Sequence, residues 1–346
     1  IMAETLGMDY INIVYAAIIP ALLYYIAAVT MVYFRASRND LQGMDEDEVP
    51  NLKKLLLSKG YLFIPLIVLI YFLVSGYTPT YAAVFAFIST IVVSLFKKET
   101  RMGPKKILEA LELGVKNALS VAIATAVVGI IVGVSTRTGF GSKLAGAIIN
   151  WSGGNLILTL FFTMIACIIL GLGMPSIPAY ILTATMAAPA LSQLGIPPLV
   201  SHFFVFYFAM MANVTPPVAL AAFAAAGISG GDINKTGYQA FKMASAGFLI
   251  PYMFVLSPAL LGLNSSMANI LLVAATAIVG VVALASANEG WLITKSNWVQ
   301  RILMFGSALA LIKPGGYSDF VGFALFITVI VYQKFVNNDK VKKANV

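Results

Sequence analysis

The segment GLGMPSIPAYILTATMAAPA, residues 171–190, lies in the middle of a very apolar chain. It places two glycines, a Met-Pro pair and a further proline where a membrane helix should run without interruption. Proline lacks a backbone donor and clashes with the preceding turn, so a regular helix does not continue through it. The segment therefore predicts a helix that is broken inside a membrane.

The composition places the whole chain in a membrane. Of the 346 residues, 60% are hydrophobic and 10% are charged, whereas a soluble domain has about 25% charged residues. Several apolar runs reach the roughly 20 residues that span a bilayer as a helix. The sequence predicts an all-α polytopic membrane protein, with the lipid bilayer as its surroundings. The net charge of +8 is then explained by basic cytoplasmic loops, and we expect no nucleic-acid partner.

Most of the apolar runs look like ordinary membrane spans. The amphipathic segment 103–116 differs, because its apolar residues share one helical face, which predicts a helix at the membrane surface. Two other segments, 155–191 and 198–226, are interrupted by glycine and proline. The predicted ordinary spans are 11–34, 61–75, 79–96, 117–134, 238–262, 269–287, 299–312 and 319–335.

Residues 155–191 form a predicted hairpin rather than a crossing. Each arm is about half a membrane long at 1.5 Å per residue. If the segment enters and leaves on one side, all but three of the 22 basic residues lie on one face, and the exceptions are Arg137, Lys143 and Lys313. Counting it as one crossing places the basic C-terminus outside, against the positive-inside rule. We therefore expect a re-entrant hairpin and a cytoplasmic C-terminus.

The second interruption is NVTPP, residues 213–217. Pro216 and Pro217 remove two backbone donors, which frees carbonyls near Ala212 and Asn213. Asn213 and Thr215 add side-chain oxygens, and neutral oxygens at a broken helix suit Na⁺. The N-terminal ends of the following half-helices suit a carboxylate. A lone proline is usually only a kink, but two breaks arranged as a hairpin and a discontinuous helix favour a binding site.

The sequence lacks the residues that disulfides, metal sites and enzyme active sites require. The chain has one cysteine, Cys167, and one histidine, His202, so we expect no disulfide, no cofactor and no metal site beyond a coupling Na⁺. His202 is predicted to be a packed or interfacial residue rather than a proton carrier. The sequence has no HExxH, no GxSxG and no paired carboxylates inside a span, so we expect no enzyme.

Several strings together resemble the large membrane subunit of TRAP (tripartite ATP-independent periplasmic) transporters. They are GLGMP, HFFVFYFA and TPPVALAAFAAAGI, with TGFGSKLAGAI before them and FLIPYMFVLSPALL after them. The similarity is greatest to the type in which the small and large membrane subunits are fused, and it covers roughly residues 1–265. The resemblance implies an elevator-type fold with two inverted repeats, each with a hairpin and a broken helix.

The resemblance also implies a function. The implied function is Na⁺ symport of an organic acid across a bacterial or archaeal inner membrane, with a periplasmic substrate-binding protein that delivers the anion. By the family's pattern, residues 155–191 are the second hairpin and 198–226 the second broken helix. The implied Na⁺ site comprises Gly173, Met174, Pro175 and Ser176 with Asn213, Val214, Thr215 and Pro216; the implied substrate residues are Ser176, Thr183 and Thr185.

The chain divides into three predicted parts. Residues 1–134 are scaffold spans and interfacial helices, 135–237 are a transport-domain repeat, and 238–346 are C-terminal transmembrane helices. No earlier Gly-rich hairpin or Pro-Pro break precedes residue 155. We therefore expect the first repeat and the fused small subunit to lie upstream of Ile1.

Two alternative functions fit the same residues. One is a divalent anion/Na⁺ symporter that needs no binding protein, and the other is a membrane assembly subunit that transports nothing itself. The sequence also leaves open which carboxylate is carried, whether Na⁺ or H⁺ is the coupling ion, and the oligomeric state.

Overall fold

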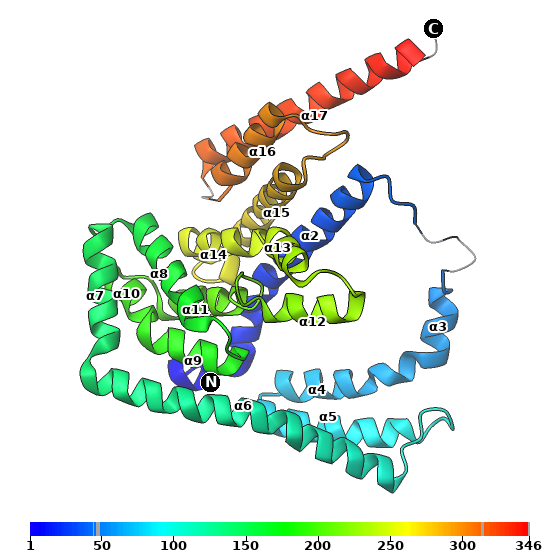
Figure 1. Ribbon diagram of the computed structural model, residues 1–346, viewed down its shortest axis with the longest axis vertical. Helices are drawn as coiled ribbons and strands as arrows, with labels where there is room; N and C mark the ends of the chain where they lie inside the picture. Colours follow the sequence, from blue (N-terminus) through cyan, green and yellow to red (C-terminus); the bar gives the residue numbers. More distant parts are fainter. Residues whose placement is uncertain (44, 46–48, 313–314, 345–346) are drawn as a thin grey trace. The chain divides into compact units, whose positions relative to one another are not determined.

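The computed structural model describes residues 1–43, 45, 49–312 and 315–344; of Ser120 and residues 336–344 it describes only the backbone. Lys313, one of the three basic residues expected on the less basic face, lies outside this range. Helices make up most of the described chain (Figure 1), and its one isolated β-bridge joins Trp291 to Lys295. The prediction of an all-α protein is confirmed.

Among the described residues, six helical segments are long and apolar enough to cross a bilayer. They are α2 (Tyr10–Arg38), the run of α3 (Leu52–Lys59), η1 (Gly60–Phe63) and α4 (Ile64–Val74), α6 (Pro104–Thr138), the pair α13 (Ile233–Met243) and α14 (Ala246–Leu256), α15 (Met267–Glu289), and residues 316–335 of α17 (Gly316–Ala344). These segments confirm a polytopic membrane protein.

Two of the predicted spans form shorter helices. The helix α5 (Pro79–Ser94) has 16 residues and α16 (Trp298–Ala310) has 13, so they are about 24 and 20 Å long at 1.5 Å per residue. Both fall short of the roughly 30 Å hydrocarbon core unless the bilayer thins around them. The cytoplasmic position of the C-terminus, which depends on counting crossings, stays a prediction.

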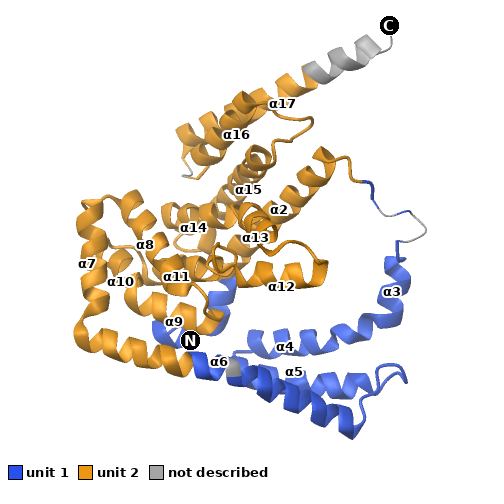
Figure 2. Ribbon diagram, in the orientation of Figure 1, with its two compact units in different colours: residues 1–15, 42–124 blue, residues 16–41, 125–346 orange. Residues whose placement is uncertain are grey.

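The chain forms two compact units (Figure 2). Residues 1–15 and 42–124 make up the first unit, and residues 16–41 and 125–346 make up the second. Both α2 and α6 therefore pass from one unit to the other. The short helix α1 (Met2–Leu6) belongs to the first unit, and the hairpin and the broken helix both belong to the second.

The first unit is built around the α4–α5 pair. The turn between these helices ends at Thr78, whose side chain accepts a hydrogen bond from the backbone nitrogen of Tyr81 and so caps α5. Next to the turn, Tyr77 and Tyr81 stack with ring centroids 4.8 Å apart, and Phe72 meets both rings edge-on. The capped turn and the aromatic cluster hold the two helices together as a pair.

One predicted boundary is absent from the structure. Residues 103–116 were expected to lie at the membrane surface and 117–134 to span it, but both belong to α6, a single helix of 35 residues. The physical reason is local: after Pro104 at its first position, the segment contains no proline, and Leu, Ala, Glu and Lys are good helix formers. The helix ends before Gly139, whose φ is +66°, and α7 (Phe140–Ser152) follows.

The second unit contains both predicted interruptions. Residues 155–191 form α8 (Leu156–Gly171), a turn, α9 (Ser176–Met186) and the start of α10 (Ala188–Gln193). Residues 198–226 form α11 (Pro198–Met211), a non-helical link and most of α12 (Leu220–Ser229). Because α8 packs on α9 and α11 packs on both, the helical hairpin and the first half of the broken helix make one block, whereas α12 packs on α13.

The C-terminal helices pack in chain order. The predicted span 238–262 is divided at Ala244 and Ser245 into α13 and α14, and η2 (Pro258–Leu261) follows. Next, α15 packs against α16, and α16 against α17. The end of α2 packs on α15 through Met31, Phe34 and Ala285.

Candidate ion and substrate site

The turn of the hairpin consists of residues 172–175, between α8 and α9. Gly173 has a φ of +73°, a backbone conformation that residues with a Cβ rarely adopt. The carbonyls of Leu172, Gly173 and Met174 accept no backbone hydrogen bond from the described residues. The turn therefore presents a row of carbonyl oxygens with free lone pairs.

Pro178 explains why one of these carbonyls is unpaired. In a helix, the carbonyl of Met174 would accept a hydrogen bond from the backbone nitrogen four residues later. That residue is Pro178, which has no N–H. The next residue does form such a bond, from the nitrogen of Ala179 to the carbonyl of Pro175 at 3.1 Å. The unpaired oxygen is thus a direct consequence of the sequence at the start of α9.

The break between α11 and α12 is more compact than the sequence suggests. Two of its carbonyls, those of Ala212 and Asn213, were expected to be free because Pro216 and Pro217 follow them. Instead, Ala212 accepts from the nitrogen of Thr215 at 3.3 Å and Asn213 accepts from that of Ala221 at 3.1 Å. Each of these oxygens retains one lone pair, but neither is unbonded.

A different carbonyl of the break is open. The carbonyl of Val214 accepts no backbone hydrogen bond from the described residues. The Thr215 hydroxyl donates to the carbonyl of Met211 at 2.7 Å, so its oxygen still has lone pairs for another partner. The Asn213 side chain is half-buried, and the Pro216–Pro217 peptide bond is cis. The break thus offers a carbonyl, an amide and a hydroxyl oxygen within three consecutive residues.

The hairpin turn lies against this break. A Cβ added to Gly171 would lie 3.1 Å from the carbonyl oxygen of Ala209 and 3.1 Å from the Cβ of Ala212. A Cβ added to Gly173 would lie 3.7 Å from a methyl of Val218. The end of α8 therefore meets the last turn of α11, and the hairpin turn meets the non-helical link.

The predicted substrate residues differ in their surroundings. Ser176, at the first position of α9, is exposed. Thr183 is fully buried, and its hydroxyl donates to the carbonyl of Ala179 at 2.9 Å. Thr185 is exposed, and its hydroxyl donates to the carbonyl of Ile181 at 2.7 Å. Ser176 is thus the one nearest the turn, while Thr183 bonds within its own helix.

One side-chain hydrogen bond, among the described residues, joins the hairpin to α11. The hydroxyl oxygen of Tyr180 lies 2.7 Å from Nδ1 of His202, within a hydrogen bond. The ring of Phe206 meets that of Tyr180 edge-on, with centroids 5.6 Å apart. The sole histidine of the chain is therefore a packed residue with a partner, as expected from the sequence.

The chemistry of the site is that of neutral oxygens. Its donors are backbone carbonyls, an amide and hydroxyls, and no group of three or more His, Cys, Asp or Glu side chains gathers anywhere in the described part of the chain. Soft or borderline metals prefer thiolate and imidazole ligands, whereas hard cations take oxygen. This arrangement is suited to a hard, weakly charged cation.

Comparison with known families identifies the chain. The family model for the DctM component of the tripartite ATP-independent periplasmic transporters matches residues 1–269. The chain belongs to this family. No curated protein and no solved structure matches it.

The DctM match covers the whole candidate site. It includes the hairpin, the broken helix and α14, and it ends just after α15 begins at Met267. DctM proteins are permease subunits of TRAP transporters, so the resemblance of the sequence strings to that large component is confirmed. The family implies a periplasmic binding protein as partner and a small molecule as substrate. Most of α15, with α16 and α17, lies beyond the match.

Sequence reasoning missed several residues of this candidate site. Pro178 carried a signal, since it stands four residues after Met174, a helical hydrogen-bond spacing. Gly171 and Val218 carried none, because their roles arise from contacts between segments far apart in the chain. The same holds for Tyr180, whose partner His202 is 22 residues away.

Proposed function

We propose that this chain forms a Na⁺ site and part of a carboxylate site in a TRAP permease, and that the permease imports an organic acid by Na⁺ symport. The observation that carries the proposal is the contact between two helix interruptions, each with unpaired carbonyl oxygens. The proposal extends the DctM family assignment, which implies a permease subunit without naming its ion or its substrate.

The Na⁺ ligands would come from both interruptions. The hairpin offers the carbonyls of Gly173 and Met174, and the break offers the carbonyl of Val214 and the side-chain oxygens of Asn213 and Thr215. Non-helical backbone at membrane depth needs partners for its polar groups. A bound Na⁺ would provide them, so the ion would also order the turn and the break.

The carboxylate would bind next to the ion. Two half-helices begin at this place, α9 at Ser176 and α12 at Leu220, and a helix N-terminus carries a partial positive charge. The Ser176 hydroxyl, which is exposed, could donate to a carboxylate oxygen. Since Na⁺ would offset the charge of the anion, each ligand would favour binding of the other, which couples their fluxes.

Movement would carry the site across the membrane. The hairpin and α11 pack as one block, so they are suited to move together in alternating access. A periplasmic binding protein would deliver the anion from outside. We place the permease in a bacterial or archaeal inner membrane with its C-terminus in the cytoplasm, following the distribution of basic residues.

Uptake into proteoliposomes tests the proposal. The full-length permease and its binding protein are reconstituted, and uptake of a labelled carboxylate bound by that protein is followed with and without an inward Na⁺ gradient. We expect uptake only with the Na⁺ gradient, and its loss in the Asn213→Ala/Thr215→Ala double variant. Uptake that ignores the Na⁺ gradient, or that survives this double substitution, would overturn the assignment.

A matched control separates the site from general damage. Thr90 in α5 resembles Thr215, because its hydroxyl donates to the carbonyl four residues earlier, that of Ala86, at 2.9 Å. Thr90→Ala therefore removes an equivalent bond from the first unit, whereas both interruptions belong to the second. We expect this variant to keep Na⁺-driven uptake at the wild-type rate.

A further inference from the structure

The contact between Tyr180 and His202 is the one side-chain hydrogen bond, among the described residues, that joins the hairpin to the broken helix. The two atoms, the Tyr180 hydroxyl oxygen and His202 Nδ1, lie 2.7 Å apart. Tyr180 is 5% exposed, whereas the His202 side chain is only half-buried. A hydrogen bond requires a defined direction, and sliding that breaks this one leaves the buried Tyr180 without the partner of its hydroxyl.

The ring contact beside this bond is apolar and therefore more tolerant of sliding. The Phe206 ring of α11 meets the Tyr180 ring edge-on, with centroids 5.6 Å apart. Apolar packing in a membrane is driven by van der Waals contact and is only weakly directional. The Tyr180–His202 bond is thus the contact that can fix the register of α9 along α11.

The register matters because both helices lead into the site. Tyr180 lies one helical turn after Ser176, which follows the hairpin turn directly. His202 stands in α11, which ends at Met211, two residues before Asn213. Since helices are rigid over these distances, a shift of α9 along α11 would change the spacing between the carbonyls of the turn and the oxygens of the break.

We propose that Tyr180 and His202 are positioning residues that hold the two halves of the Na⁺ site at the spacing the ion requires. This inference rests on the proposed function, because it assumes that Na⁺ binds between the turn and the break. Neither side chain is a ligand: the bond places the ligands of other residues.

Equilibrium binding of ²²Na⁺ to the purified full chain tests the inference. Tyr180→Phe removes one oxygen atom and keeps the ring, and His202→Leu removes the partner of the Tyr180 hydroxyl. We expect either change to raise the Kd for Na⁺ about tenfold. The Kd of the double variant should be no higher than that of the single variant with the higher Kd. His202→Asn places an amide near the position of Nδ1, so it should restore part of the affinity.

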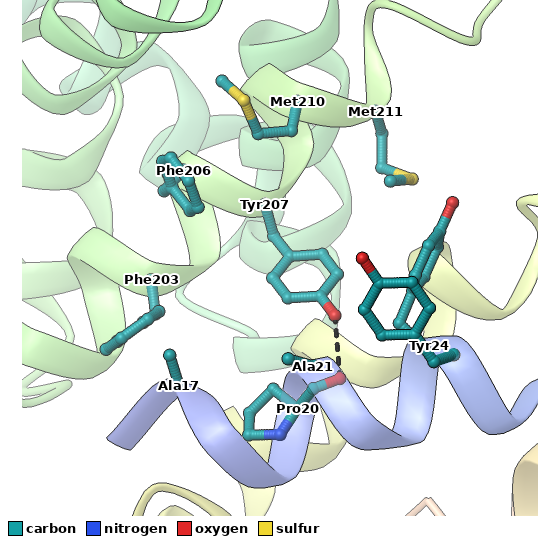
Figure 3. A pocket seen from close by; sticks show the side chains of 10 residues that line it. Ala17, Pro20, Ala21, Tyr24, Phe203, Phe206, Tyr207, Met210 and Met211 are labelled. Carbon is teal, nitrogen blue, oxygen red and sulfur yellow. Dashed lines mark hydrogen bonds between the residues drawn. The ribbon is translucent and has the colours of Figure 1, made fainter. Parts of the chain in front are cut away.

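Tyr207→Phe is the matched control. Tyr207 lies on the same helix, but its hydroxyl donates to the carbonyl of Pro20 in α2 at 3.1 Å (Figure 3), beside a cavity of about 370 Å³ between the two helices. The substitution removes the same atom from the same type of residue without touching the hairpin. We expect the Kd for Na⁺ to stay within twofold of the wild-type value.

The outcomes separate this inference from the proposed function. If the wild-type chain shows no saturable ²²Na⁺ binding, or if K⁺ displaces the label equally well, the proposed Na⁺ site is wrong. If the wild type binds and Tyr180→Phe and His202→Leu keep its Kd within twofold, the positioning role is wrong while the site stands. Because the apparent Kd rises when only a fraction of the chain is folded, the Kd values are compared for variants that thermal unfolding shows to be folded at the assay temperature.

Discussion

The ammonium nitrogen of Lys242 lies 3.1 Å from a carboxylate oxygen of Glu289, whose side chain is only 2% exposed. The two groups meet as charges, without the angles of a hydrogen bond. The backbone carbonyl of the same Glu289 accepts a hydrogen bond from Arg38 at 2.7 Å. One residue at the end of α15 thus ties that helix to α13 and to α2.

We predict that removing the lysine will destabilise the protein more than removing both charges. Lys242→Met leaves a buried carboxylate without its cation, which should cost roughly 3 kcal/mol. The Lys242→Met/Glu289→Leu double variant leaves no charge and should recover most of the stability. Thermal unfolding in detergent measures both, and a double variant less stable than Lys242→Met would contradict the role of the pair.

The exposed pair of Glu112 and Lys116 provides the comparison. Their charged atoms are even closer, at 2.6 Å, but both side chains are more than 60% exposed. Water screens such a pair, so Glu112→Gln should change the stability by less than about 1 kcal/mol. Equal losses of stability in Lys242→Met and Glu112→Gln would show that burial of Glu289 has no special effect.

The close approach of the hairpin to α11 should depend on Gly171. Gly171→Val would place a Cβ about 3.1 Å from a backbone oxygen of α11, which cannot move aside as a side chain can. We expect the free energy of unfolding to fall by about 1 to 3 kcal/mol and the binding of ²²Na⁺ to weaken. Thermal unfolding and equilibrium binding measure the two effects.

Gly227 in α12 is the control for that substitution. A Cβ there would meet nothing within 4 Å, so Gly227→Val introduces the same side chain into a helix without a clash. It should bind Na⁺ with the wild-type Kd. If both valine variants bind Na⁺ equally well, the contact at Gly171 is not needed for the site.

Pro178→Ala tests the carbonyl of Met174 as a ligand. Alanine restores a backbone N–H four residues after Met174, so that carbonyl could accept a helical hydrogen bond instead of coordinating Na⁺. We expect the thermal stability to stay the same or rise while the Kd for Na⁺ increases several-fold. An unchanged Kd in a well-folded variant would remove Met174 from the set of ligands.

The interruptions themselves could be predicted from the sequence because their causes are local. Glycine at a positive φ and proline without a donor act on their own turn of helix, whatever packs around them. The turn at residues 172–175 and the link before α12 accordingly lie where the sequence indicates. The predicted boundary near residue 117 rested only on a change from charged to apolar residues, and such a change does not end a helix.

The details of the site depend on contacts that no local pattern encodes. The Asn213 carbonyl is bonded to Ala221, eight residues later, because the chain folds back across the break. The bond between Tyr180 and His202 and the burial of Glu289 both arise between helices that are distant in the sequence. Local reasoning therefore located the two interruptions, while the pairing of their oxygens needed the structure.

Protection of cysteines by Na⁺ tests whether the turn and the break form one ion site. In a Cys167→Ser background, single cysteines replace Ile177 beside the turn and Val218 in the break, with Ile228, which is 90% exposed, as a distant control. A shared site predicts that Na⁺, but not K⁺, slows maleimide labelling at 177 and 218 with the same midpoint concentration and leaves 228 unaffected. Protection at only one of the two positions, or equal protection by K⁺, would contradict a shared Na⁺ site.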